Sequence, residues 1–231
     1  DQYWVVGGGP KYNDEGKLYK PKGSEVLFFE NREIFKAEHG AGFDLFAIDK
    51  ENQVPIGIEA KNIREWLYPA SQEVWRAIAR ACTLECLPVI AARKISYITT
   101  AGMFSRFGIM GFETQFQYFH NDVQKESKYQ FKDKVIHKDR LGFADIKLVK
   151  QKDKPPKHFN HFFENILPNY SQEYFDRFME NRELLMTYAI DYGLADNKLN
   201  GKERFELYKE FQEEAEFADP EFEEPEIKAE I

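Results

Sequence analysis

Hydrophobic positions in the first half of the chain change period, and each change marks a predicted element. The segment 25–38 (EVLFFENREIFKAE) has apolar residues at helical spacing after Ser24, a suitable N-cap, which predicts a helix. Two apolar runs, 43–48 and 54–61, flank the polar turn DKEN at 49–52. This arrangement predicts two paired strands that follow the helix.

The pattern then returns to a helical period at residues 71–86. The apolar stripe of this predicted helix is Val74, Ile78, Ala81 and Cys82, and a polar line on another face is Gln72, Arg76 and Arg80. Further strands are predicted at 87–92, 96–100, 112–119 and 143–149. The order of helix, two strands, helix and strands predicts an α/β fold with a mixed sheet.

The character of the chain changes beyond about residue 155. An aromatic stretch at helical spacing, with Ser171 as a candidate cap, predicts helices that pack on the preceding domain. The final segment combines acidic residues, Phe and two prolines, which is typical of a flexible tail. We therefore expect an α/β core at 1–154, a helical extension at 155–211 and an acidic tail at 212–231.

The net charge of −8 belongs to the C-terminal end of the chain. Residues 202–231 carry 12 acidic and 4 basic residues, whereas residues 1–201 carry 28 of each sign. The stretch 125–157 has 11 Lys and Arg against 5 Asp and Glu. That stretch is either a solvated face or a surface that follows phosphates, and in the second case the acidic tail would cover it. A polyanionic partner is therefore compatible with the chain.

The two cysteines, Cys82 and Cys86, lie one helical turn apart and are too few for a disulfide framework. No long apolar run predicts a membrane span, and the first residues do not resemble a signal peptide. We therefore expect a protein of the reducing cytoplasm, with no membrane partner.

Charged residues interrupt the second strand of the predicted hairpin. Glu59 and Lys61 are two residues apart, so they share a face of the strand IGIEAKN, and Asp44 on the preceding strand can pair near them. Carboxylates are hard oxygen ligands that suit Mg²⁺, and the carbonyl oxygen of Ala60 could add another. The alternative is an edge-strand ion pair that faces water.

The set of Asp44 and Glu59-Ala60-Lys61 resembles the PD-(D/E)XK nuclease superfamily, and this resemblance spans about residues 24–100. It implies a restriction-endonuclease-like fold. In that family the Asp and Glu bind Mg²⁺, for which Mn²⁺ substitutes, and the Lys acts on water. The reaction is hydrolysis of phosphodiester bonds to 5′-phosphate and 3′-hydroxyl ends. DNA rather than RNA, and endonuclease rather than exonuclease activity, are the family expectations.

The resemblance also suggests supporting residues. Many members of the family carry a Glu on the first helix, for which Glu25, Glu30 and Glu33 compete and Glu30 is favoured. A Gln on the helix after the second strand is matched by Gln72. Phe43 stands where the family motif has Pro. Four cations are candidates for holding phosphates, which would set affinity and register: Arg76, Arg80, Arg93 and Lys94.

Other motifs are weaker. A second acid-x-Lys set, Asp145 to Lys147, lies on a more polar strand and favours a half-exposed ion-pairing face. His158 and His161 could share a helix face, but no Cys or further His nearby completes a metal site. The glycine-rich GGGPK at 7–11 lacks the ending of a phosphate-binding loop.

Two rivals to a nuclease remain at this stage. One is a nuclease-like domain that binds nucleic acid without cutting it, and the other is a protein-interaction domain, favoured by the aromatic helices and the acidic tail. If the protein cuts both strands of a duplex, two active sites are usually needed, which favours a homodimer.

Overall fold

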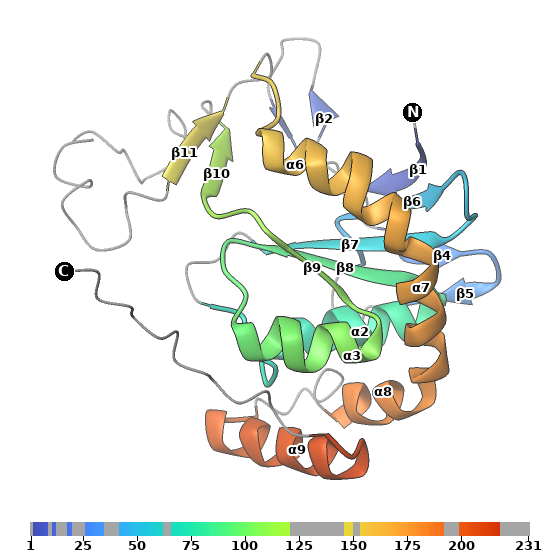
Figure 1. The fold of residues 1–231 in the computed structure, drawn as a ribbon, viewed down its shortest axis with the longest axis vertical. Coiled ribbons are helices and arrows are strands. Elements are labelled where there is room, and N and C mark those ends of the chain that lie inside the picture. Colours follow the sequence, from blue (N-terminus) through green and yellow to red (C-terminus); the bar gives the residue numbers. More distant parts are fainter. Residues whose placement is uncertain are drawn as a thin grey trace, which may run out of the picture.

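The computed structural model describes residues 2–8, 11–12, 18–19, 26–34, 42–61, 66–120, 146–149, 153–191 and 199–217. A five-stranded mixed sheet with helices on both faces forms its centre (Figure 1). Its order is β1-β6-β7-β8-β9. The β1–β6 and β6–β7 pairs are antiparallel, and the β7–β8 and β8–β9 pairs are parallel. These strands are β1 (Tyr3–Gly8), β6 (Leu45–Asp49), β7 (Pro55–Lys61), β8 (Leu87–Ala92) and β9 (Met110–Glu113).

The β6–β7 pair is the hairpin that the sequence predicts. Leu45 pairs with Ile58 and Ile48 with Pro55, and Gln53 takes a positive φ of 59° in the turn. Gly57 is required in β7 because a Cβ there would lie 2.5 Å from the ring of Phe43. The space beside Gly57 is therefore filled by Phe43.

A parallel crossover carries the chain from β7 through α2 (Gln72–Leu84) to β8, confirming the predicted helix and strand. Val74, Ile78 and Cys82 of α2 are fully buried, as the apolar stripe requires. Glu85 ends the helix in the left-handed conformation and its N–H bonds to the carbonyl of Ala81. The helix lies along the sheet, so that it begins near the C-terminal ends of β7 and β8.

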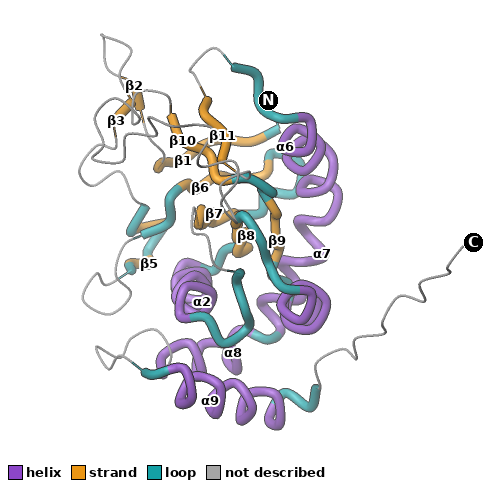
Figure 2. The backbone as a smooth tube through the Cα atoms, turned by 90° about the vertical axis from the view of Figure 1, so that its left-hand side faces the viewer, coloured by secondary structure: helices purple, strands orange, loops and turns teal. Residues whose placement is uncertain are grey.

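Two apolar cores lie on opposite faces of the sheet. Figure 2 shows the helices that cover these two faces. One includes Phe46 and Ile90 and is covered by α2 and by the C-terminal helices α8 (Arg182–Ala189) and α9 (Gly201–Glu214). The other includes Ile58 and Val89. It is covered by three consecutive elements, which are α6 (Lys157–His161), the π-helical η2 (Phe162–Ile166) and α7 (Leu167–Glu180). The helices after residue 155 thus contribute to both cores.

The C-terminal helices differ from the prediction in their boundaries. Ser171 does not cap a helix; it lies inside α7, fully buried. Helix α9 begins with a capping box between Asn200 and Glu203, and it extends to Glu214, past the predicted boundary at residue 211. The division into core, extension and tail stays a prediction, and residues 218–231 of the tail lie outside the described residues.

The predicted helix at 25–38 is wrong over the part of it that the structure describes. Residues 26–34 contain a short antiparallel pair, β4 (Phe28–Phe29) and β5 (Arg32–Glu33), and Val26 bridges to Phe43. Glu30 occupies the turn with a φ of 54°. The segment ENR supplies polar turn residues, and pairing of its flanks with each other and with Phe43 prevails over the helical spacing.

Three other predicted strands change. Residues 96–100 are not a strand but lead into the π-helical segment η1 (Ile98–Phe104), which is followed by α3 (Ser105–Phe107). The run 112–119 is divided between β9 and β10 (Gln117–His120). The run 143–149 gives β11 (Ile146–Val149), which pairs in parallel with β10.

The structure also describes the short pair β2 (Lys11–Tyr12) and β3 (Leu18–Tyr19). Within the described ranges, no helix combines the length and the apolarity that a bilayer crossing needs.

Candidate functional site

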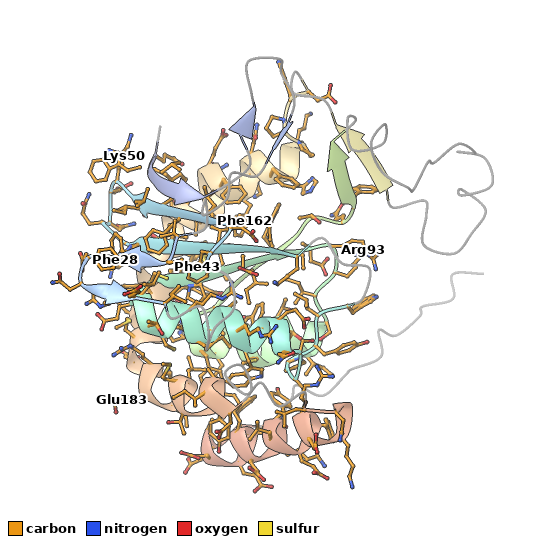
Figure 3. All side chains as sticks on the ribbon, turned by 180° about the vertical axis from the view of Figure 1, so that it is seen from behind. Phe28, Phe43, Lys50, Arg93, Phe162 and Glu183 are labelled. Atoms are coloured by element: carbon orange, nitrogen blue, oxygen red, sulfur yellow. The ribbon has the colours of Figure 1, made fainter. Side chains whose placement is uncertain are left out.

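The charged residues predicted from the hairpin meet at one end of the sheet. Asp44 directly precedes β6, and Glu59 and Lys61 are at the C-terminal end of β7. Continuing the register of the two strands by one pair places Asp44 opposite Glu59. Figure 3 shows Arg93, which follows β8, at this end of the sheet and Lys50, in the β6–β7 turn, at the other. The structure therefore brings the three predicted residues together.

Asp44 is fixed to the backbone of β7. Its Oδ2 accepts a hydrogen bond of 2.9 Å from the N–H of Ala60. In an extended strand the N–H and C=O of one residue point to the same side, as they do when two paired residues exchange both bonds. The carbonyl oxygen of Ala60 is therefore directed to the side of the strand on which Asp44 lies.

Glu59 is buried and held by two cations. Its side chain is only 5 % exposed; Oε2 lies 2.6 Å from Nη1 of Arg80, and Oε1 contacts Nζ of Lys61. The Arg80 side chain is 4 % exposed, and its Nη1 also donates to the carbonyl of Gly42 at 3.2 Å. A buried carboxylate is costly unless it is paired, so these contacts explain how the core tolerates Glu59.

Arg80 is a member of the site with a role that the sequence did not predict. The sequence suggests that it holds phosphates, whereas in the structure it is buried and bonded to Glu59. The sequence gives little signal for this role, because Arg76 on the same polar line also lies between apolar residues, Trp75 and Ala77, yet is only half-buried. The contact with Glu59, which is distant in the sequence, distinguishes Arg80.

The charges of this group are balanced. Asp44 and Glu59 contribute two negative charges, and Lys61 and Arg80 contribute two positive charges. Arg80 also keeps one buried polar atom, Nε, without a hydrogen-bond partner. An additional cation and the anionic group it binds could therefore enter together without leaving a large net charge.

The donor set fits a hard divalent cation with few protein ligands. Asp44, Glu59 and the carbonyl of Ala60 offer oxygen atoms, which Mg²⁺ prefers, and Mg²⁺ usually keeps several of its waters. No cluster of three or more His, Cys, Asp or Glu side chains suited to a metal occurs among the residues that the structure describes. Since Glu59 binds Arg80 and Lys61, such a cation would share or displace those contacts.

Of the supporting residues predicted around this site, Glu30 lies away from it and Gln72 lies on α2. Glu30 is not on a helix; its side chain is 61 % exposed and bonds to Arg32 at 2.6 Å. Arg32 also contacts Glu85 at the C-terminal end of α2, so the turn lies away from Asp44 and Glu59. Glu33 lies in β5 beside that turn, and Glu25 is outside the described residues. Gln72 is half-buried at the first position of α2, two turns before Arg80.

The remaining predicted cations lie near the same end of the sheet. Arg76 is half-buried one turn before Arg80, and its Nε is buried without a hydrogen-bond partner. Arg93 and Lys94 directly follow β8, and Lys94 lies 3.5 Å from a carboxylate oxygen of Glu113. Their assignment to phosphate binding stays a prediction.

Of the weaker motifs, Asp145 lies outside the described residues, as does most of the basic stretch 125–157. His158 is half-buried with its ring centroid 5.8 Å from that of Phe112, and His161 is exposed on α6.

Both cysteines are free and buried. Burial raises the pKa of the Cys82 thiol to about 12, which keeps it protonated and unreactive near neutral pH.

Comparison of the chain with family models, curated proteins and solved structures finds no match. The functional argument therefore rests on the geometry of the site.

Proposed function

We propose that this protein is a metal-dependent nuclease of the restriction-endonuclease-like type, which hydrolyses phosphodiester bonds of DNA. The observation that supports this most is the position of Asp44 opposite Glu59, with Lys61 on the same face and the Ala60 N–H bonded to Asp44 at 2.9 Å. The mixed sheet and the crossover helix α2 are compatible with that fold.

Each residue has a role in this proposal. Asp44, Glu59 and the carbonyl of Ala60 would hold Mg²⁺, which when bound stabilises negative charge on phosphate oxygens. Lys61, at the open end of β7 with its side chain 22 % exposed, holds and orients the attacking water. Arg80 is a positioning residue that keeps the Glu59 carboxylate in one orientation, through the 2.6 Å contact to its Oε2.

One observation favours a second candidate, a domain that binds nucleic acid without cutting it. Both carboxylate oxygens of Glu59 are engaged by cations, Oε1 by Lys61 and Oε2 by Arg80. If these pairs are never released, Glu59 is a structural residue and no cation can bind it.

Cleavage of a nucleic-acid panel decides between the two. Plasmid, linear duplex, single-stranded DNA and RNA are incubated with Mg²⁺ or Mn²⁺, and with a chelator. We expect metal-dependent cutting of DNA that falls by at least about a hundredfold in Lys61→Ala, because oriented water and charge stabilisation each contribute factors of this order. Lys209→Ala, which removes an ammonium from α9 that lies over the Phe205 ring, is the matched control and should cut normally.

Isothermal titration of Mg²⁺ gives a readout that does not depend on cutting. Binding to the wild type that is lost in Asp44→Asn and in Glu59→Gln would support the ligand assignment. Salt-dependent DNA binding with no cutting and no Mg²⁺ binding would instead establish the silent binding domain.

A further inference from the structure

Three large aromatic side chains are exposed where the sheet ends. Trp66 is 48 % exposed, and Tyr68 and Tyr97 are each 54 % exposed. Trp66 and Tyr68 precede α2, and Tyr97 precedes η1, but the backbone bridge between Leu67 and Ile95 brings the two segments together. We refer to Trp66, Tyr68 and Tyr97 as the aromatic edge.

The buried residues between these aromatics direct them outward. Leu67 is 1 % exposed and Ile95 is 3 % exposed, and both belong to the core beneath α2. Since neighbouring side chains of an extended segment point in opposite directions, Trp66 and Tyr68 point away from that core. Their exposure is thus a consequence of the backbone and not of a loose surface loop.

The backbone that carries the aromatic edge is held by hydrogen bonds. The N–H of Leu67 donates to the carbonyl of Lys94 at 3.1 Å, and the N–H of Ser96 donates to the carbonyl of Leu67 at 2.9 Å. The buried hydroxyl of Thr99 donates to the same carbonyl at 3.0 Å. The rings are therefore presented from a fixed backbone, which lowers the entropy lost when a ligand stacks on them.

The aromatic edge lies close to the candidate site. Lys61 pairs in register with Ala92, and Ile95 follows three residues later. Three residues span at most about 10 Å, so Ile95 lies within about that distance of Ala92, the residue paired with Lys61. Arg93 and Lys94 lie between the two, so cationic side chains separate the aromatics from the acidic residues.

Alternation of cations and exposed aromatics is the pattern that binds unpaired nucleotides. Cations follow the phosphates, and aromatic rings stack on bases, which they can reach only where the bases are not paired. In a duplex the base faces are covered by their neighbours, so exposed aromatics would contribute little. The other strongly exposed aromatics, such as Trp4 on β1 and Tyr170 on α7, lie apart from one another in the sequence and the sheet order.

We propose that the aromatic edge binds unpaired bases and thereby directs the protein to single-stranded nucleic acid or to single-stranded segments of a duplex. This inference rests on the proposed function for its placement of a phosphate at the site, and it adds the class of substrate. Trp66 and Tyr68 stack on bases next to the phosphate that lies at Asp44, Glu59 and Lys61.

Tryptophan fluorescence tests the stacking without requiring cleavage. The chain has three tryptophans, of which Trp75 is fully buried, so Trp4→Leu leaves Trp66 as the exposed reporter. With a chelator present, an oligothymidylate of about twelve nucleotides should quench Trp66, and a duplex of equal length should quench it much less. No quenching by the single strand would overturn the proposal.

Affinity measurements on variants give the second arm. Trp66→Leu should weaken binding of the oligothymidylate by about five- to a hundredfold, since stacking contributes this much per base, and should change duplex binding little. Tyr170→Leu, which removes a ring of 47 % exposure from α7, is the matched control and should leave affinity unchanged. Equal losses for single strand and duplex would overturn the proposal.

The outcomes separate this inference from the proposed function. Quenching of Trp66 by single strands with no metal-dependent cutting would support base binding by the aromatic edge and contradict the proposed nuclease activity. If Trp66→Leu still cuts, with an unchanged preference between single-stranded and duplex substrates, the nuclease activity would be supported and the proposed role of the aromatic edge would be overturned. A wild-type dimer that becomes monomeric in Trp66→Leu would assign this surface to a second copy of the chain and would also overturn it.

Discussion

Asp49 and Glu59 are both buried carboxylates of one hairpin, but they are held in different ways. Asp49 is 1 % exposed and Glu59 is 4 % exposed. Asp49 accepts hydrogen bonds from neutral donors, which are the Ser171 hydroxyl at 2.7 Å, the Asn52 amide at 2.9 Å and the N–H of Glu51 at 3.1 Å. Glu59 instead contacts the cations Lys61 and Arg80.

The two sets of partners imply different functions for the two carboxylates. The neutral donors around Asp49 come from the hairpin turn and from α7, so their bonds fix that helix against the sheet. The cations around Glu59 neutralise its charge, and another cation could replace either of them as its partner. Burial by itself therefore does not distinguish the two carboxylates; the charge of their partners does.

The largest effect on stability is expected from Arg80→Met. This change leaves the Glu59 carboxylate buried with only Lys61 as a partner, and we expect unfolding free energy to fall by about 3 kcal/mol. Urea unfolding of the full chain measures it. Adding Glu59→Gln should recover most of the loss, because the unpaired charge is then removed.

A matched control exists for this experiment at the other end of α2. Arg32 pairs with Glu85, and both side chains are about one-third exposed. Arg32→Met should therefore cost less than about 1 kcal/mol, because partly exposed ion pairs contribute little. Equal losses in Arg80→Met and Arg32→Met would mean that Glu59 does not depend on Arg80, and the contrast with Asp49 would fail.

A smaller effect is expected from Asp49→Ala. It removes the acceptor of the Ser171 hydroxyl and of one Asn52 bond, and we expect a loss of about 2 kcal/mol in urea unfolding. DNA cutting at a temperature where the variant is folded should equal that of the wild type. If Asp49→Ala abolished cutting while folded, the distinction between the two carboxylates would be wrong.

These contrasts also show how far the sequence could lead. The hairpin, α2 and β8 follow from local patterns, since each has an apolar run of the right period with polar ends. Asp44, Glu59 and Lys61 were brought together correctly because a hairpin register is a local property. Their chemistry stays a proposal.

Residues whose role depends on distant partners could not be placed in this way. Serine is a common helix cap, yet Ser171 is buried within α7. Its hydroxyl donates a hydrogen bond to Asp49, which lies 122 residues earlier in the chain. Arg80 is a candidate for holding phosphates on the sequence because it continues the polar line of Gln72 and Arg76, but in the structure it is buried against Glu59. The 25–38 segment has helical spacing, but pairing to Phe43 decides its structure. In each case a tertiary contact prevails over a local preference.

The smallest effect concerns Tyr3, which lies opposite Asp49 in the β1–β6 pair. Its hydroxyl donates to the carbonyl of Phe163 at 2.7 Å, and burial, with a further contribution from the charge of Asp49, raises the pKa of Tyr3 well above its usual value. Tyr3→Phe should therefore cost about 1 kcal/mol at neutral pH.

The raised pKa of Tyr3 determines how its contribution to stability depends on pH. Because the folded state keeps Tyr3 protonated longer than the unfolded chain does, the stabilisation is complete below about pH 10 and is lost as pH rises further. The stability difference between wild type and Tyr3→Phe, followed by urea unfolding, should shrink above that pH. In Asp49→Asn, which lacks the negative charge, the pKa of Tyr3 should be raised less, so the total loss should be smaller and should end at a lower pH; an equal loss would show that Asp49 does not act on Tyr3 through its charge.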